Sequence, residues 1–309
     1  MRHALLAATA VLGLAAPALA DSFGPLVTPA ELSGKLAEVK PVILDLRAQG
    51  PDQSFVPGAL SAPYGRFRGP KDNPGALPDL ATLETFFEEL GLTPDSPIVV
   101  VPEGKTDSDF GAAARVYWTL KSTGFTDLSI LNGGEQAWRA AGFPTEPAPA
   151  APAAASALTL TWLPDWTADT AEITRIVGGE EQAVLIDARP ADFFEGKQQH
   201  EAAAKPGTLP GAESHAYTAF FPGGATTMTP AADVQALKDS LGIDGQKPVV
   251  SFCNTGHWAA TEWFALSEVA GIPEVKLYPG SMVEYSQTGQ PMENTPGLLD
   301  NALNQIFKG

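Results

Sequence analysis

The sequence is poor in the residues that form disulfides and metal centres. Among its 309 residues there is one cysteine, Cys253, and there are four histidines. A single cysteine excludes an internal disulfide and a cysteine-rich zinc site, and so few histidines argue against a histidine-based metal cluster. We therefore expect a functional site without a metal ion and without a cofactor.

Positive charge is also scarce. Lys and Arg number 19 against 36 Asp and Glu, which gives a formal net charge of −17. A nucleic-acid partner requires a basic surface to neutralise its phosphates, and an anionic membrane surface attracts basic segments for the same reason. The charge balance therefore predicts that neither nucleic acid nor membrane is a partner. The 28 prolines and 30 glycines exclude a coiled coil or a simple helical bundle.

The first twenty residues have the pattern of a secretory signal peptide. Basic residues at positions 2–3 precede an apolar segment at 4–16, and residues 18–20 read Ala-Leu-Ala, which fits a cleavage site of the Ala-x-Ala type. The apolar segment is too short to act as a membrane anchor. We predict cleavage before Asp21 and export of a soluble protein to the periplasm.

A Pro/Ala-rich linker at residues 146–157 divides the remaining chain into two halves of similar size. Four patterns recur in the same order in both halves, which indicates an internal duplication. We predict a first domain over 21–145 and a second over 158–309. The matching segments are 42–47 with 184–189, 56–64 with 209–217, 97–101 with 248–252, and 131–134 with 278–281.

Both halves alternate short apolar runs with amphipathic stretches. The runs lack polar–apolar alternation, which is typical of strands buried on both faces of a parallel sheet. We therefore predict an α/β fold of two tandem domains, each an open parallel sheet with helices on both faces. The predicted strands are 42–46, 98–101, 184–188 and 249–252, and the predicted helices are 80–90, 111–122, 231–241 and 259–269.

Cys253 ends one of these predicted strands, and the loop at 254–258 leads into the following helix. In open parallel sheets, ligands bind outside the carboxyl ends of the strands. A helix N-terminus at that place offers unpaired amides and the positive end of its dipole. We predict Cys253 as a nucleophile, with Gly256 allowing the loop amides to point at the sulfur. The alternative is that Cys253 is a small apolar side chain filling the core.

The first half carries no such nucleophile. Pro102 occupies the position of Cys253, and the loop that follows is four residues longer than its counterpart. We therefore predict that the first domain is degenerate and non-catalytic.

Several motifs occur in order along the two halves: Asp-x-Arg at 45–47 and 187–189, Pro-Gly-Ala at 57–59 and 210–212, Leu-Asn-Gly-Gly at 131–134 with Trp138, and Cys-Asn-Thr-Gly at 253–256. With these motifs, nearly the whole chain after the leader resembles the rhodanese superfamily. It is most similar to tandem-domain sulfurtransferases of the thiosulfate and 3-mercaptopyruvate type.

The resemblance implies a catalytic second domain with Cys253 as the nucleophile. A sulfane sulfur from a small donor would pass to a thiophilic acceptor through a persulfide on this cysteine. The alternative is a periplasmic sulfur carrier that delivers its persulfide to a protein partner. The persulfide-binding loop would consist of Asn254, Thr255, Gly256, His257 and Trp258.

The loop departs from thiosulfate and mercaptopyruvate transferases, which typically have basic residues there or an arginine soon after Asp-x-Arg. Phe193 stands where that arginine is expected. Arg189 with Asp187 is a candidate substrate ligand. However, Arg47 holds the same place in the half without a nucleophile, which favours structural pairing with the neighbouring aspartate.

Other candidates for substrate contact are further from Cys253 in sequence. Arg66 and Arg68 could reach across from the first domain, and an insertion at 196–210, with Lys197, His200 and Lys205, could form a lid. His257 could donate to the persulfide or lie solvated at a helix start. Trp258 is predicted to pack against the pocket wall.

Two other functions compete with this interpretation. A phosphatase of the Cys-x5-Arg type requires an arginine at position 259, where this chain has Ala259. A non-catalytic exported binding protein could clamp a ligand between two α/β lobes. The duplicated motifs and the cysteine loop argue against that second function.

Overall fold

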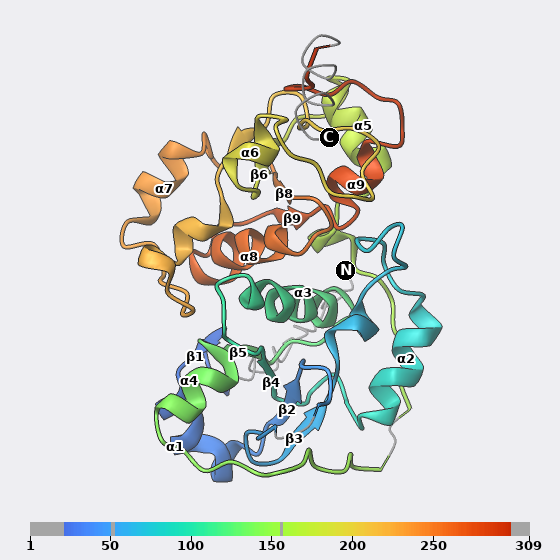
Figure 1. The fold of residues 1–309 in the computed structure, drawn as a ribbon. Helices are drawn as coiled ribbons and strands as arrows, with labels where there is room; N and C mark the ends of the chain where they lie inside the picture. The colour runs from blue at the N-terminus through green and yellow to red at the C-terminus, as the bar shows by residue number, and fades with distance from the viewer. Residues whose placement is uncertain (1–21, 51–52, 155–156, 298–309) are drawn as a thin grey trace, which may run out of the picture.

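The computed structural model describes residues 22–50, 53–154 and 157–297, and they form two α/β domains (Figure 1). The predicted signal peptide lies outside the described residues. Among the helices of the described part, none is long and apolar enough to cross a membrane.

The first domain is built on a parallel sheet in the order β1-β5-β4-β2-β3. The predicted runs at 42–46 and 98–101 form the neighbouring strands β2 and β4. All four residues of β4 are buried, because the sheet is covered on both faces. The strands are β1 (Leu26–Val27), β2 (Val42–Asp45), β3 (Ala59–Ser61), β4 (Ile98–Val101) and β5 (Leu128–Leu131).

The second domain repeats this topology with the order β7-β6-β8-β9. A single parallel bridge between Thr167 and Leu277 takes the place of the β1–β5 pair. The predicted fold class, two tandem domains with open parallel sheets, is therefore confirmed. The strands are β6 (Val184–Asp187), β7 (Glu213–Ser214), β8 (Val249–Phe252) and β9 (Val275–Leu277).

Helices cover both faces of each sheet, as predicted. The predicted helix at 259–269 is an α-helix, α8, that continues as a π-helical turn over Ala265–Val269. The helices are α1 (Pro29–Val39), α2 (Leu80–Glu89), α3 (Asp109–Ser122), α4 (Gly134–Ala140), α5 (Thr170–Val177), α6 (Ala191–Phe194), α7 (Val234–Ser240), α8 (Trp258–Phe264) and α9 (Ser281–Tyr285).

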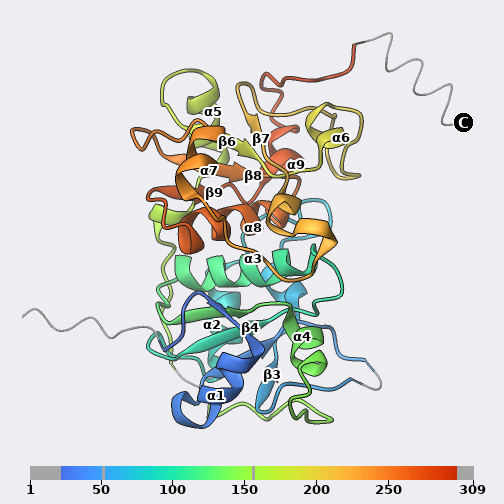
Figure 2. The same ribbon diagram turned by 90° about the vertical axis from the view of Figure 1, so that its left-hand side faces the viewer.

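The two domains share one apolar core. Helices α3 and α8 pack against each other between the two sheets (Figure 2). Aromatic rings join them: Tyr117 of α3 meets Phe264 of α8 edge-on, with ring centroids 5.1 Å apart, and Phe110 also contacts Phe264. A large apolar interface of this kind holds two domains in a fixed relation.

The segment after the first domain is not a bare linker throughout. Glu146 pairs with Phe55 as an antiparallel bridge, and its carboxylate accepts the amide of Gly58 at 3.1 Å. The second domain repeats both contacts with Glu293, which pairs with Thr208. The predicted linker at 146–157 therefore begins with a residue that is still paired with the first domain.

Candidate active site

Cys253 follows β8 directly, at the carboxyl end of the second sheet, as predicted. Its side chain is only 1% exposed and lies against a cavity of about 200 Å³. The wall of this cavity comes from both domains and consists of Arg68, Ser108, His200, Cys253, Asn254, Thr255, His257 and Trp258.

A serine from the next strand–helix connection holds the loop. The amides of Cys253 and Gly256 donate to Oγ of Ser281, at 3.0 and 3.1 Å, and this hydroxyl donates to the carbonyl of Tyr278. The amide of Gly256 is therefore not among the loop amides that are free for the sulfur, because Ser281 accepts it. The amides of Asn254, Thr255 and His257 have no acceptor among the described residues. These three remain available for an anion.

Two unusual backbone conformations shape the loop. Gly256 has a φ of +66°, and a Cβ at this position would lie 2.7 Å from the carbonyl oxygen of Pro279 and would also collide with Arg115. Ser281 has a φ of 51°, where the first domain has Gly134. A non-glycine residue in this region costs of order 1 kcal/mol. The hydrogen bonds from the amides of Cys253 and Gly256 to the Ser281 hydroxyl offset the cost of this conformation.

Arg115 of the first domain supports the loop from behind. It is fully buried in α3, and its guanidinium donates to the carbonyls of Gly256 at 3.3 Å, Thr255 at 3.5 Å and Gly75 at 3.0 Å. Burial, with a contribution from Arg68, lowers the pKa of Arg115 to about 9, so the group stays charged at neutral pH. Sequence reasoning missed this residue, although an arginine within the apolar helix at 111–122 was a visible signal.

His257 joins the loop to the first domain. Its Nε2 lies 2.9 Å from the carbonyl oxygen of Ser108, which can only accept, so Nε2 carries the proton. Nδ1 then accepts the hydroxyl of Tyr64 at 2.9 Å. Burial, together with Arg68, lowers the pKa of His257 to about 4, so the ring is neutral. His257 is therefore neither a cation for the persulfide nor a solvated residue at a helix start.

Trp258 lines the cavity, as predicted. Its indole nitrogen donates to Oγ of Ser108 at 2.9 Å, and its ring stacks on Tyr217 with centroids 5.2 Å apart. Phe193, in the place expected for an arginine, packs edge-on against the same indole. Phe193 therefore supports the cavity-lining ring of Trp258 and does not itself line the cavity.

Arg189 and Asp187 are paired with each other and do not line the cavity. The guanidinium makes two bonds to the carboxylate, Nε at 2.8 Å and Nη2 at 2.6 Å, and Nη1 donates to Oδ1 of Asn254 at 3.2 Å. Both side chains are buried. Arg47 pairs with Asp45 in the same way. Arg189 and Asp187 are therefore not placed to contact a substrate in the cavity. Arg189 instead orients Asn254.

Arg66 lies away from the cavity. It lies within the 3₁₀ turn at Tyr64–Phe67, and its guanidinium lies over the ring of Phe86, 3.7 Å from the carboxylate of Glu89. Arg68, two residues further on, lines the cavity instead. Of the two arginines expected to reach across from the first domain, Arg68 therefore lines the cavity and Arg66 does not, because the two side chains leave this turn towards different parts of the molecule.

The insertion at 196–210 contributes one side chain to the cavity wall, His200. Its Nδ1 accepts the amide of Ala202 at 3.2 Å, and burial lowers its pKa. Lys197 is exposed and binds Glu195, and neither it nor Lys205 lines the cavity. The insertion therefore covers the site without the positive charge that a lid of lysines would supply.

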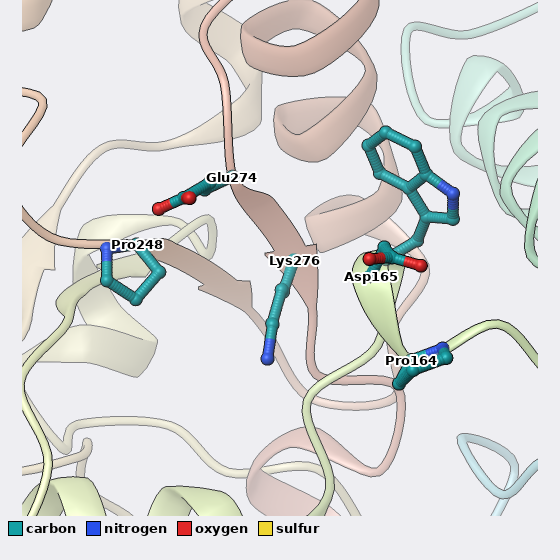
Figure 3. A pocket seen from close by; sticks show the side chains of 6 residues that line it. Pro164, Asp165, Pro248, Glu274 and Lys276 are labelled. Carbon is teal, nitrogen blue, oxygen red and sulfur yellow. The ribbon is translucent and has the colours of Figure 1, made fainter. Parts of the chain in front are cut away.

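A larger pocket, of about 590 Å³, lies at the opposite edge of the second sheet (Figure 3). Pro248 and Glu274 precede strands β8 and β9, and Lys276 of β9 is bound to Glu172 at 2.7 Å. This pocket contains no thiol and lies at the amino ends of the strands. In the part of the chain that the structure describes, no group of three His, Cys, Asp or Glu side chains could hold a metal ion.

A profile of the rhodanese-like domain family matches residues 28–141 and 169–288. The chain belongs to this family and carries two copies of its domain. The second match includes Cys253 and the whole loop described above.

The chain is similar to proteins that are named thiosulfate sulfurtransferases. It is 31% identical to one from Azotobacter vinelandii, over 86% of this chain and 96% of the relative. It is 30% identical to one from Pseudomonas aeruginosa, over 84% and 93%. It is also 28% identical to the sulfur carrier protein TtuD of Thermus thermophilus, over 76% and 83%.

Solved structures share the fold. The crystal structure of SseA from Escherichia coli, described as a 3-mercaptopyruvate sulfotransferase, matches with a TM-score of 0.70 and 22% identity, over 84% of this chain and 99% of that chain. A complex of EanB with ergothioneine matches with a TM-score of 0.75 and 20% identity, over 87% and 70%.

Proposed function

We propose that this protein is a sulfurtransferase in which Cys253 carries the transferred sulfur as a persulfide. In this proposal the second domain, residues 158–309, is catalytic and the first, residues 21–145, is not. The observation that carries it is a single thiol at the carboxyl end of β8, beside a cavity and three loop amides that have no acceptor in the described part of the chain. Similarity to thiosulfate sulfurtransferases supports the same reaction class.

The reaction has two steps. The Cys253 thiolate attacks the outer sulfur of a sulfane donor, a sulfur–sulfur bond forms, and the electron pair of the broken bond leaves with the donor remainder, which is sulfite when thiosulfate is the donor. An acceptor nucleophile then attacks the outer sulfur, and Cys253 leaves as a thiolate. The open amides of Asn254, Thr255 and His257 would stabilise the negative charge in both steps.

The composition suits a persulfide intermediate. A second thiol nearby could attack the persulfide and convert it into a disulfide, and Cys253 is the only cysteine in the sequence. The persulfide would extend into the cavity by one sulfur–sulfur bond, about 2 Å. An acceptor would therefore meet the outer sulfur inside the cavity.

The test is the intact mass of the purified protein after incubation with thiosulfate or another sulfane donor. We expect a gain of one sulfur atom, its loss on addition of cyanide, and no gain in Cys253→Ser. If no donor loads the protein, or if Cys253→Ser is loaded equally, the proposal is wrong.

Delivery to a protein partner is a second candidate, supported by the similarity to the sulfur carrier TtuD. The low exposure of Cys253 disfavours direct contact with a folded partner, since its thiol would have to enter the cavity. Discharge of the loaded protein by cyanide and by a small thiol would favour the enzyme. A persulfide that resists both and is lost only to a protein thiol would favour the carrier.

Export to the periplasm is also a proposal and rests on the leader at residues 1–20. If the full chain is produced in a bacterium, the periplasmic fraction should contain a protein that begins at Asp21. Recovery of the chain only from the cytoplasm, with its leader intact, would contradict export.

A further inference from the structure

We propose that Arg68, which belongs to the non-catalytic first domain, binds the anionic group of the sulfur donor in the Cys253 cavity. The proposal deepens the proposed function, because it assumes a donor that approaches Cys253. It assigns a specificity-determining role to a residue almost two hundred positions before the nucleophile.

The first observation is the position and bonding of the guanidinium. Arg68 lines the cavity together with Cys253, and its Nη1 is buried without a hydrogen-bond partner among the described residues. The group lies over the ring of Tyr64, with the guanidinium carbon 5.3 Å from the ring centroid. A buried charged donor without an acceptor is costly to leave unpaired. A ligand in the cavity can supply the missing acceptor.

The second observation is the charge of the cavity wall. Among its eight lining residues, Arg68 is the one Lys or Arg, and none is Asp or Glu. His200 and His257 are neutral at pH 7, and Arg68 itself contributes to lowering the pKa of both rings. The cavity is therefore electropositive inside a strongly acidic protein.

The other nearby arginines cannot take this role. Arg115 is buried and its two Nη groups donate to loop and first-domain carbonyls; its Nε also has no partner among the described residues, but Arg115 does not line the cavity. Arg189 is fully engaged with Asp187, Asn254 and the carbonyl of Gly207. Both sustain the loop from behind, and Arg68 alone of the three lines the cavity.

The third observation comes from the internal repeat. Tyr64 corresponds to Tyr217, and the same offset of 153 places Arg68 opposite Phe221. Phe221 packs against Phe110 of the first domain, with ring centroids 5.7 Å apart. The fold therefore accepts an apolar side chain at this position, and the charge of Arg68 is not a requirement of the architecture.

The geometry favours donors that carry an anionic sulfonyl group next to the transferable sulfur, which are thiosulfate and the organic thiosulfonates. Arginine can donate two parallel hydrogen bonds to such oxygens. With a thiosulfonate, Cys–S⁻ and R–SO₂–S⁻ give Cys–S–S⁻ and the sulfinate R–SO₂⁻. The bond between the two donor sulfurs breaks, and its electron pair leaves with the sulfinate.

The first experiment does not depend on sulfur transfer. Cys253 is alkylated with iodoacetate and with iodoacetamide, which have the same reactive carbon and differ in charge. The ratio of the two rate constants reports the attraction of an anion into the cavity. We expect Arg68→Gln to lower this ratio by about tenfold, the equivalent of losing one charge-assisted hydrogen bond.

Arg66→Gln is the matched control, since it removes the same charge two residues away and outside the cavity. We expect Arg66→Gln to leave the ratio of the two rate constants unchanged. We expect Arg68→Lys to retain most of the wild-type ratio. An equal fall in the Arg66 and Arg68 variants would show a general charge effect and overturn the proposal. An unchanged ratio in a folded Arg68→Gln protein, with its cooperative thermal unfolding retained, would overturn it as well.

The second experiment measures thiosulfate:cyanide kinetics. Arg68→Gln should raise KM for thiosulfate about tenfold or more with a smaller change in kcat, because donor and transition state share the contact. A larger fall in kcat with KM unchanged would contradict a binding role. If the wild-type protein is never loaded with sulfur but its alkylation ratio depends on Arg68, the sulfurtransferase proposal fails and the anion site stands.

Discussion

The loops that follow β4 and β8 begin in the same way and then diverge. The carbonyls of Pro102 and Cys253 each accept an amide from the next strand–helix connection at 3.0 Å, from Glu135 and Met282 respectively. After this shared contact, the first-domain loop is four residues longer than the second-domain loop. The amides of Lys105 and Thr106 in it donate to the carboxylate of Asp109, at 2.7 and 3.0 Å. The second-domain loop leaves amides open beside a thiol.

The difference supports the proposal that the first copy is not catalytic. An offset of 147 places Asp109 opposite Gly256. The Asp109 carboxylate therefore occupies the amides of the first-domain loop, whereas the amides of the second-domain loop are open to an anion. A backbone cradle occupied by a fixed carboxylate cannot bind a second negative charge. Loss of the cysteine and internal occupation of the cradle are therefore separate features of the first domain.

The largest expected effect tests which copy is catalytic. Cys253→Ser should abolish persulfide formation, because the chain has no other thiol. Moving the thiol in the double variant Pro102→Cys/Cys253→Ser should not restore it, since the longer loop is closed by Asp109. Intact mass after donor treatment measures both.

Sulfur loading of the double variant would contradict the interpretation of the first loop as degenerate. A further variant, with Asp109→Asn added, separates the two causes. Loading only in this triple variant would show that the carboxylate, and not the loop length, closes the first site.

The next effect concerns the shape of the cradle. Gly256→Ala should reduce turnover by about 100-fold, since the added Cβ collides with Pro279 and Arg115 and displaces the reacting sulfur. Gly271→Ala is the matched control, because Gly271 has the same φ of +66° with open space around it. Steady-state kinetics and thermal unfolding of both variants separate collision from backbone strain. Equal losses in the two would show that strain alone matters.

A smaller effect is expected from Ser281. Ser281→Ala leaves the amides of Cys253 and Gly256 without an acceptor, which should cost about 1–3 kcal/mol of stability and slow the reaction. Ser281→Gly lacks the hydroxyl as well but relieves the positive φ, as Gly134 does in the first domain. Denaturant unfolding should rank the wild type above the glycine variant and the alanine variant last. An alanine variant as stable as wild type would contradict the role of the hydroxyl.

The smallest effect is a pH dependence at the domain junction. The pKa of His257 is lowered to about 4 in the folded protein, so the folded state favours the neutral ring. The stability of this contact is complete above the unfolded pKa of about 6.5 and is lost as the pH falls towards 4. His257→Gln, which can still bind Tyr64 and Ser108, should remove of the order of 1 kcal/mol of this acid sensitivity. Denaturant midpoints at pH 7 and pH 5 for both proteins measure it, and identical shifts would contradict it.

Features that depend on local pattern were predictable from the sequence. The Val/Ile runs identified β2, β4, β6 and β8 because strands buried on both faces are uniformly apolar. The repeat placed Cys253 at the end of a strand and indicated the longer first loop. The repeat also marks Ser281 as a departure between the copies, since it stands where the first copy has Gly134.

Contacts across the domain interface were not predictable in this way. Tyr64 and His257 are 193 positions apart, and Arg115 and Gly256 are 141 apart. Apolar periodicity indicates which face of a helix is buried, but not which helix covers it. For this reason the sequence could not distinguish Arg68 from Arg66, because the direction of each side chain at a 3₁₀ turn depends on packing against the rest of the fold.

The buried bonds from Arg115 to the loop carbonyls make the two domains comparable to the subunits of an obligate dimer that happen to share one chain. The half that lacks the thiol contributes the residues that hold and enclose the thiol of the other half. Under the proposed function, neither of the two rhodanese-like copies would be a complete enzyme by itself. The cavity beside Cys253 is built by both halves, so it exists only while both are folded and docked.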